Sequence, residues 1–148
     1  MKTLALGALA LALASLPVLE AVSARPLVPA EKRYSPFTGK LPPCDDKGVL
    51  GVIADRFQEK ESLYWKSALQ IKAFDHAHEY AFRRNGLDYI PRRYCTARAT
   101  LNDEKRHEVT YWIGERLGII GWDYGVEWCV SGLDRNRAFA PGCREARP

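Results

Sequence analysis

Two histidines, His76 and His78, lie close together in a short polar segment that Asp75 and Glu79 flank. Side chains two residues apart share one face of a β-strand, so both imidazoles would point the same way in a strand. Such a pair can ligate a metal ion, or one imidazole can act as a general base in a pocket. Two ligands rarely hold zinc, and no third ligand is evident. Asp75, His76 and His78 are therefore candidate ligand-binding residues, without a metal or cofactor; the simpler interpretation is an exposed face of a sheet.

A second candidate site is basic. Arg92 and Arg93 precede Tyr94, and Arg98 follows shortly after. This group could hold an anion, although arginine is normally exposed and a solvated face is the more common meaning of such a cluster. No serine occurs in a G-x-S-x-G context and no phosphate-binding loop is present, so the sequence predicts no catalytic residue.

The charge pattern argues against nucleic-acid binding. The formal net charge is +4, and the 22 basic and 18 acidic residues are interspersed along the chain without a long basic run. Neutralising a phosphate backbone requires clustered positive charge. We therefore expect an envelope protein or a small ligand as the partner, and no nucleic acid.

The candidate residues must be positioned by one long helix and the strands after it. Val49, Ile53 and Phe57 recur at helical spacing and predict a helix from about Asp46 to Trp65, which Asp45 or Asp46 can cap. Residues 68–82 predict a strand with a bulge, with a helical continuation as the alternative. A turn at Asn85-Gly86 follows.

Three further strands are predicted by alternation of apolar and polar residues. Cys95, Ala97, Ala99 and Leu101 share one face of the first. The second lies around residues 109–113, after a polar loop at 102–106. A loop around Gly118 leads to the last strand, whose aromatic and apolar face is expected to cover the helix as core: Trp122, Tyr124, Val126, Trp128 and Val130.

Four cysteines, without a C-x-x-C pair, indicate two disulfides rather than a zinc site. An antiparallel return brings the start of the helix to the start of the second strand, so we expect Cys44 to pair with Cys95. Cys129 lies near the far end of the last strand, on its outer face, where the tail can fold back. We therefore expect Cys129 to pair with Cys143.

The first 24 residues predict an export signal, because a basic start and an apolar run end in small residues at Val22 and Ala24. Residues 25–43 contain five prolines and predict an extended arm. Residues 44–148 predict one α+β domain. The expected location is periplasmic or secreted, and no integral membrane segment is expected after signal cleavage.

The order of one helix and four strands resembles the cystatin-like and nuclear-transport-factor-like group, and implies one long helix packed on a curled four-stranded antiparallel sheet. Separately, the segments Ile90-Pro91-Arg92-Arg93-Tyr94-Cys95 and Gly125-Val126-Glu127-Trp128-Cys129-Val130 resemble those of small uncharacterised exported proteins of alphaproteobacteria. That resemblance implies a compartment and no particular activity.

Two hypotheses follow for the function. The first is a non-catalytic binding or interaction module of the cell envelope, supported by export, disulfides, abundant aromatic residues and the absence of a catalytic motif. The second is a small pocket enzyme of the nuclear-transport-factor-like kind, with Asp75 or His76 as the base. We favour the first, because a similar order of elements does not confer an activity.

Overall fold

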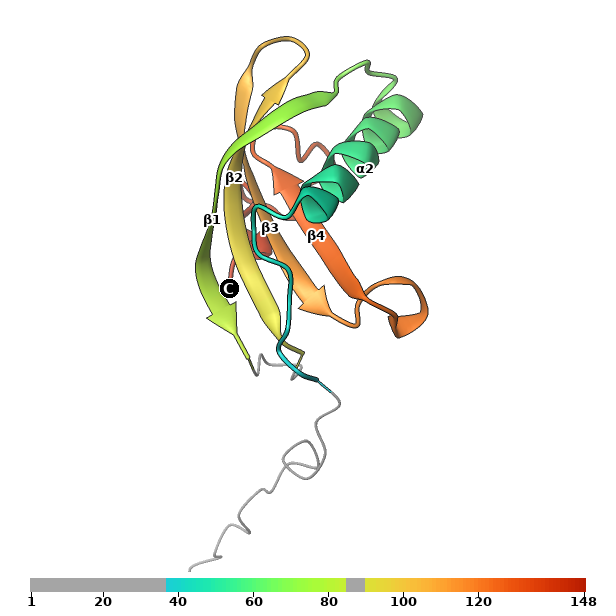
Figure 1. Cartoon of the computed structure of the whole chain (residues 1–148). Helices are drawn as coiled ribbons and strands as arrows, with labels where there is room; N and C mark the ends of the chain where they lie inside the picture. Colours follow the sequence, from blue (N-terminus) through green and yellow to red (C-terminus); the bar gives the residue numbers. More distant parts are fainter. Residues whose placement is uncertain (1–36, 85–89) are drawn as a thin grey trace, which may run out of the picture.

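The computed structural model describes residues 37–84 and 90–148, and these form a helix on a four-stranded antiparallel sheet (Figure 1). The export signal, most of the arm and the Asn85-Gly86 turn lie outside the described residues. Two 3₁₀ turns complete the described elements. In chain order they are α2 (Lys47–Trp65), β1 (Ile71–Arg83), β2 (Arg92–Leu101), β3 (Arg106–Glu115), η1 (Ile119–Gly121), β4 (Tyr124–Val130) and η2 (Arg144–Ala146). The predicted α+β class and strand order are confirmed, and the order of elements is consistent with the cystatin-like one.

Helix α2 begins and ends where the sequence indicates. The Val49 amide donates to Asp46 Oδ1 over 3.0 Å, so Asp46 caps the first turn. The helix ends at Trp65, and the next residue, Lys66, caps it: Lys66 is left-handed with φ 50° and donates its amide to the Glu61 carbonyl. One face of α2 is buried against the sheet, and this face contains Val49, Ile53, Phe57 and Glu61.

The core lies between α2 and the inner face of the sheet. As predicted, Cys95, Ala97, Ala99 and Leu101 of β2 are all buried. The small side chains of Cys95, Ala97 and Ala99 let the helix approach the sheet closely. From β3, the core receives Val109, Tyr111 and Ile113.

Tyr111 joins the core to the start of the helix. Its hydroxyl donates a 2.6 Å hydrogen bond to the carbonyl oxygen of Cys44. Burial raises the pKa of the Tyr111 hydroxyl, and the negative charge of Asp45 adds to this rise. The phenol therefore stays protonated and keeps its donor proton.

Strand β1 carries the irregularities that the sequence indicated. Its register against β2 shifts between Asp75 and His78 and between Glu79 and Ala81, whereas β2, β3 and β4 pair without a shift. Bulges bend strands, so three strands without them keep the sheet from curling strongly. The prediction of a curled sheet is therefore wrong.

Two disulfides hold the domain, with the predicted pairing. Cys44 is bonded to Cys95 with a Cα–Cα distance of 5.7 Å, and Cys129 to Cys143 with 5.5 Å. These bonds indicate an oxidising, extracytoplasmic environment. Among residues 37–84 and 90–148, no helix is long and apolar enough to cross a membrane.

The last strand starts later than the alternation predicts. Strand β4 begins at Tyr124, and Trp122 is 80% exposed, so its assignment to the strand and to the core is wrong. Asp123 is left-handed with φ 57°, which breaks the extended backbone before Tyr124. Trp128, by contrast, packs edge-on against Phe57 with ring centroids 6.0 Å apart.

Candidate functional site

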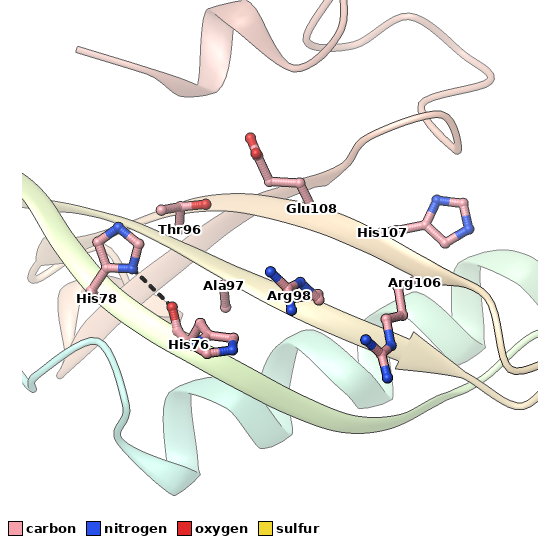
Figure 2. Close-up of a pocket in the computed structure, with 8 residues that line it drawn as sticks. All are labelled: His76, His78, Thr96, Ala97, Arg98, Arg106, His107 and Glu108. Carbon is pink, nitrogen blue, oxygen red and sulfur yellow. Dashed lines mark hydrogen bonds between the residues drawn. The ribbon is translucent and has the colours of Figure 1, made fainter.

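The outer face of the sheet, turned away from α2, carries two neighbouring cavities. The first has a volume of about 360 Å³ (Figure 2), and is lined by His76, His78, Thr96, Ala97, Arg98, Arg106, His107 and Glu108. The second has a volume of about 210 Å³, and is lined by Tyr80, Thr96, Glu108, Thr110 and Arg147. Thr96 and Glu108 line both cavities, so the two form one continuous polar surface.

The histidine pair lies on the first cavity, beside Asp75. His76 sits in the bulge of β1 with φ 52°, and its Nε2 is 3.6 Å from Asp75 Oδ1. His78 Nδ1 is 2.8 Å from the carbonyl oxygen of His76, as the dashed line in Figure 2 shows. The side chains of His76 and Asp75 are 70% and 44% exposed. The bulge therefore brings the three residues together on an open surface.

No metal centre forms there. Among the residues that the structure describes, no group of three or more histidine, cysteine, aspartate or glutamate side chains could hold a metal ion. A metal site would need at least one further ligand beside His76 and His78.

Ion pairs occupy much of the charge on the outer face. Arg98 Nη1 lies 3.7 Å from Asp75 Oδ1, and Arg147 Nη2 lies 2.9 Å from Glu108 Oε1. His107 Nδ1 is 2.8 Å from the Ser131 carbonyl oxygen. The Arg147 and His107 contacts attach the tail after β4 to the sheet, and the Arg98 contact joins β2 to β1.

The second cavity contains one unsatisfied polar atom. Thr110 is buried, and its Oγ1 has no hydrogen-bond partner among the described residues. Burial raises the pKa of the neighbouring Tyr80 hydroxyl; the Arg147 charge opposes this rise, and Tyr94 and Glu108 support it. A water molecule or a small hydroxyl-bearing ligand could satisfy Thr110 here.

The predicted basic cluster does not form one patch. Arg92 and Arg93 are adjacent on β2 and therefore lie on opposite faces of the sheet. The Arg92 guanidinium stacks 4.7 Å from the Trp112 ring centroid, and Arg93 forms an ion pair with Glu79. Tyr94 is buried beside Tyr80, with ring centroids 6.4 Å apart. The structure thus places Arg93 on the face opposite to Arg92 and Tyr94.

A second surface, which the sequence analysis missed, is the loop between β3 and β4. We call residues 116–123 the docking loop. Ile119, Ile120 and Trp122 are 82%, 91% and 80% exposed, and Leu117 is also exposed. Large apolar side chains grouped in this way on a surface commonly mark an interaction site. An apolar run between Gly118 and Gly121, inside a predicted loop, was the available signal.

The backbone of the docking loop is ordered by its own contacts. The Gly121 amide donates to the Gly118 carbonyl over 3.2 Å, and the Trp122 amide donates to the Ile119 carbonyl over 3.1 Å. A Cβ atom at Gly118 would collide with the Trp122 carbonyl oxygen. The loop therefore presents its apolar side chains from a closely packed backbone.

The docking loop lies at an end of the sheet with several exposed cations. Arg83, Arg92, Gly114 and Gly125 are register partners in one row across the four strands, and the docking loop extends beyond that row. Figure 1 shows the loop projecting from this end, near the start of the described chain. Three exposed side chains contribute positive charge here: Arg83, Arg84 and Arg116.

The start of the described chain is fastened to the same end. The Glu115 carboxylate is buried and accepts hydrogen bonds from the Thr38 amide over 2.8 Å, the Gly39 amide over 2.7 Å and the Thr38 hydroxyl over 3.1 Å. Glu115 is the last residue of β3, directly before the docking loop. The arm therefore joins the domain beside the docking loop.

No protein-family model, curated protein sequence or solved structure matches this chain. The function is therefore inferred from the two surfaces described above.

Proposed function

We propose that this protein is a non-catalytic interaction module of the cell envelope that attaches to its partner through the docking loop. The proposal is carried by Ile120, which is 91% exposed and has left-handed backbone angles, φ 58° and ψ 28°. A β-branched residue in this conformation destabilises the folded state, and glycine or asparagine would fit it better.

The exposed position of Ile120 provides no packing that offsets this strain. Strained residues are retained mainly where they serve a function. An isoleucine that neither fills the core nor suits its backbone is best explained by a surface that it contacts outside the protein. Ile119 and Trp122, exposed beside it, enlarge the apolar area available to that contact.

The enzyme hypothesis, with Asp75 or His76 as a base, ranks second. A general base works best where burial and positioned neighbours tune its pKa. Asp75 and His76 instead have largely exposed side chains on an open surface. A small ligand bound at the outer-face cavities is likewise a weaker proposal, because ion pairs engage Arg98 and Glu108 there.

A site-specific photocrosslinker tests the proposal in cells. Placed at Ile120, it should give light-dependent adducts with one component of the envelope, and the substitution Trp122→Ser should remove most of them. The matched control position is Glu104, which is exposed, lies in the turn between β2 and β3, and is also left-handed with φ 64°. Equal adducts from positions 120 and 104, or adducts that persist after Trp122→Ser, would exclude the docking loop as the contact surface.

A further inference from the structure

Resting on the proposed function, we infer that the docking loop binds the surface of a lipid bilayer with anionic headgroups. Three observations favour a bilayer over a protein: the shape of the loop, the types of its exposed side chains and the charge around it. Each concerns described residues at one end of the sheet.

The shape of the docking loop suits insertion into a surface. It extends past the row of Gly114 and Gly125 and projects away from the body of the domain (Figure 1). A stable protein interface buries roughly 800 Å² on each partner, which calls for a broad and complementary face. A bilayer requires only apolar side chains that can reach below the headgroups. A single projecting loop can insert its apolar side chains into a bilayer more readily than it can form a broad protein interface.

The exposed side chains also match the layers of a bilayer. Ile119 and Ile120 are purely apolar and belong in the hydrocarbon region. Trp122 combines a large apolar ring with a polar N–H group, and tryptophan is enriched at the boundary between headgroups and hydrocarbon. All three side chains are at least 80% exposed in the protein alone. They are therefore available without any unfolding of the domain.

The charge around the docking loop favours anionic lipids. Arg116 is exposed within the docking loop, and the exposed side chains of Arg83 and Arg84 lie at the same end of the sheet, at the end of β1. Of the carboxylates at this end, Asp123 is exposed within the loop, whereas Glu115 is buried and engaged by Thr38 and Gly39, so exposed arginines outnumber exposed carboxylates. A basic residue close to an anionic surface strengthens binding by about fivefold. The cations thus add to the apolar contact and select the kind of lipid.

Co-sedimentation with vesicles tests the inference. The protein is purified in its exported, oxidised form, its N-terminus is determined, and it is mixed with vesicles of phosphatidylcholine alone or with added phosphatidylglycerol. We expect clear binding to the anionic vesicles and weak binding to the neutral ones. The double variant Ile119→Ser/Ile120→Asn should weaken binding by about tenfold or more, because the inserted apolar area is lost. Arg116→Gln should weaken it by about fivefold.

The matched control is the double variant Asp103→Ser/Glu104→Asn in the turn between β2 and β3, which should bind as the unchanged protein does. Thermal unfolding of each variant shows that the domain is folded. Absence of vesicle binding, or equal binding by the Ile119→Ser/Ile120→Asn variant, would overturn the lipid inference. Specific crosslinks from position 120 to an envelope protein, without vesicle binding, would leave the proposed function standing with a protein as partner. If there were neither vesicle binding nor specific crosslinks from position 120, both the lipid inference and the proposed function would be overturned.

Discussion

The turn between β2 and β3 and the docking loop between β3 and β4 both reverse the chain at the ends of β3, yet their side chains differ in kind. The turn, residues 102–105, is polar, whereas the docking loop exposes Ile119, Ile120 and Trp122. Both contain left-handed residues that are not glycine: Glu104 in the turn, and Arg116, Ile120 and Asp123 in the loop. A chain reversal can thus be made with polar side chains, so the exposed apolar side chains of the docking loop are not required for it.

The polar turn uses its side chains to stabilise the fold. Asn102 Nδ2 donates to the Ala68 carbonyl over 2.8 Å, and Asn102 Oδ1 accepts from the Gln70 amide over 3.1 Å. The Lys105 amide donates to Asp103 Oδ1 over 3.2 Å. Short polar side chains commonly satisfy backbone groups in turns in this way.

The docking loop reverses the chain mainly with backbone hydrogen bonds and two closely packed glycines, Gly118 and Gly125. Its exposed isoleucines and tryptophan contribute no core packing. Substitutions in the turn should therefore lower stability, and substitutions of these three side chains should not.

The largest effect is expected in the middle of β3, the strand that joins the two connections. Tyr111→Phe should lower the free energy of unfolding by about 2 kcal/mol, because the buried Cys44 carbonyl loses its donor. Chemical denaturation measures this change. If the free energy of unfolding of Tyr111→Phe equalled that of the unchanged protein, the hydrogen bond from Tyr111 to the Cys44 carbonyl would not stabilise the fold.

The same variant should change the alkaline limit of stability. Burial raises the folded-state pKa of Tyr111 above its unfolded value of about 10, so the folded state retains a proton that the unfolded state releases. The resulting stabilisation is complete below pH about 10 and is lost as the pH rises further. Tyr111→Phe should flatten this loss in unfolding curves recorded at increasing pH. Tyr80 and Tyr124, whose pKa values burial also raises, should leave a smaller loss in the variant.

Asn102→Ala tests the polar turn directly. It removes the side-chain hydrogen bonds to Ala68 and Gln70, and should lower the free energy of unfolding by about 1.5 kcal/mol. Amide exchange at Gln70 should also accelerate. Asp103→Ala, which removes an exposed hydrogen bond and an exposed ion pair, both to Lys105, is the control and should cost less. Equal losses in the two variants would argue against a special role for Asn102.

Ile120→Asn should stabilise the protein, in contrast to the variants above, which should destabilise it. Asparagine tolerates the left-handed conformation, so the free energy of unfolding should rise by about 0.5–1 kcal/mol. Ile119→Asn is the matched control, since Ile119 is equally apolar but is not left-handed, and its effect on stability should be close to zero. A clear loss of stability in Ile120→Asn would show that this side chain supports the fold.

The smallest effect is expected for Trp122→Ser, which should change the free energy of unfolding by less than about 0.5 kcal/mol. Trp128→Ser is the contrasting control, because Trp128 packs against Phe57 and should cost several times more. Thermal unfolding of both variants distinguishes an exposed tryptophan from one that the core needs. If the two variants lost similar amounts of stability, Trp122 would support the fold, and the docking loop would not differ from the polar turn in this respect.

The sequence predicted the elements whose periodicity is strong. Helical spacing located α2, and the alternation of Cys95, Ala97, Ala99 and Leu101 identified the buried face of β2. The same topology gave the disulfide pairing, because it brings the start of α2 to the start of β2. These features depend on which residues are buried, and the spacing of apolar residues along the sequence shows this directly.

The missed features depend on contacts between distant strands or on single backbone angles. Alternation alone extends the last strand to Trp122, because nothing in the order of residues shows that Asp123 adopts φ 57°. Likewise, Arg92 and Arg93 look like one basic patch in the sequence, but in the structure the Arg93 side chain pairs with Glu79 and the Arg92 side chain stacks over Trp112. For these reasons the open histidine surface was predicted and the docking loop was not.

The disulfides also determine when the domain can become stable. By restricting the unfolded chain, the link across 51 residues stabilises the fold by about 4 kcal/mol and the link across 14 residues by about 3 kcal/mol. Together these values rival the whole folding stability of an ordinary small domain. In a reducing compartment the chain lacks this contribution and should be far less stable. Oxidation supplies it, so the domain should reach its full stability only in the oxidising environment that the disulfides indicate.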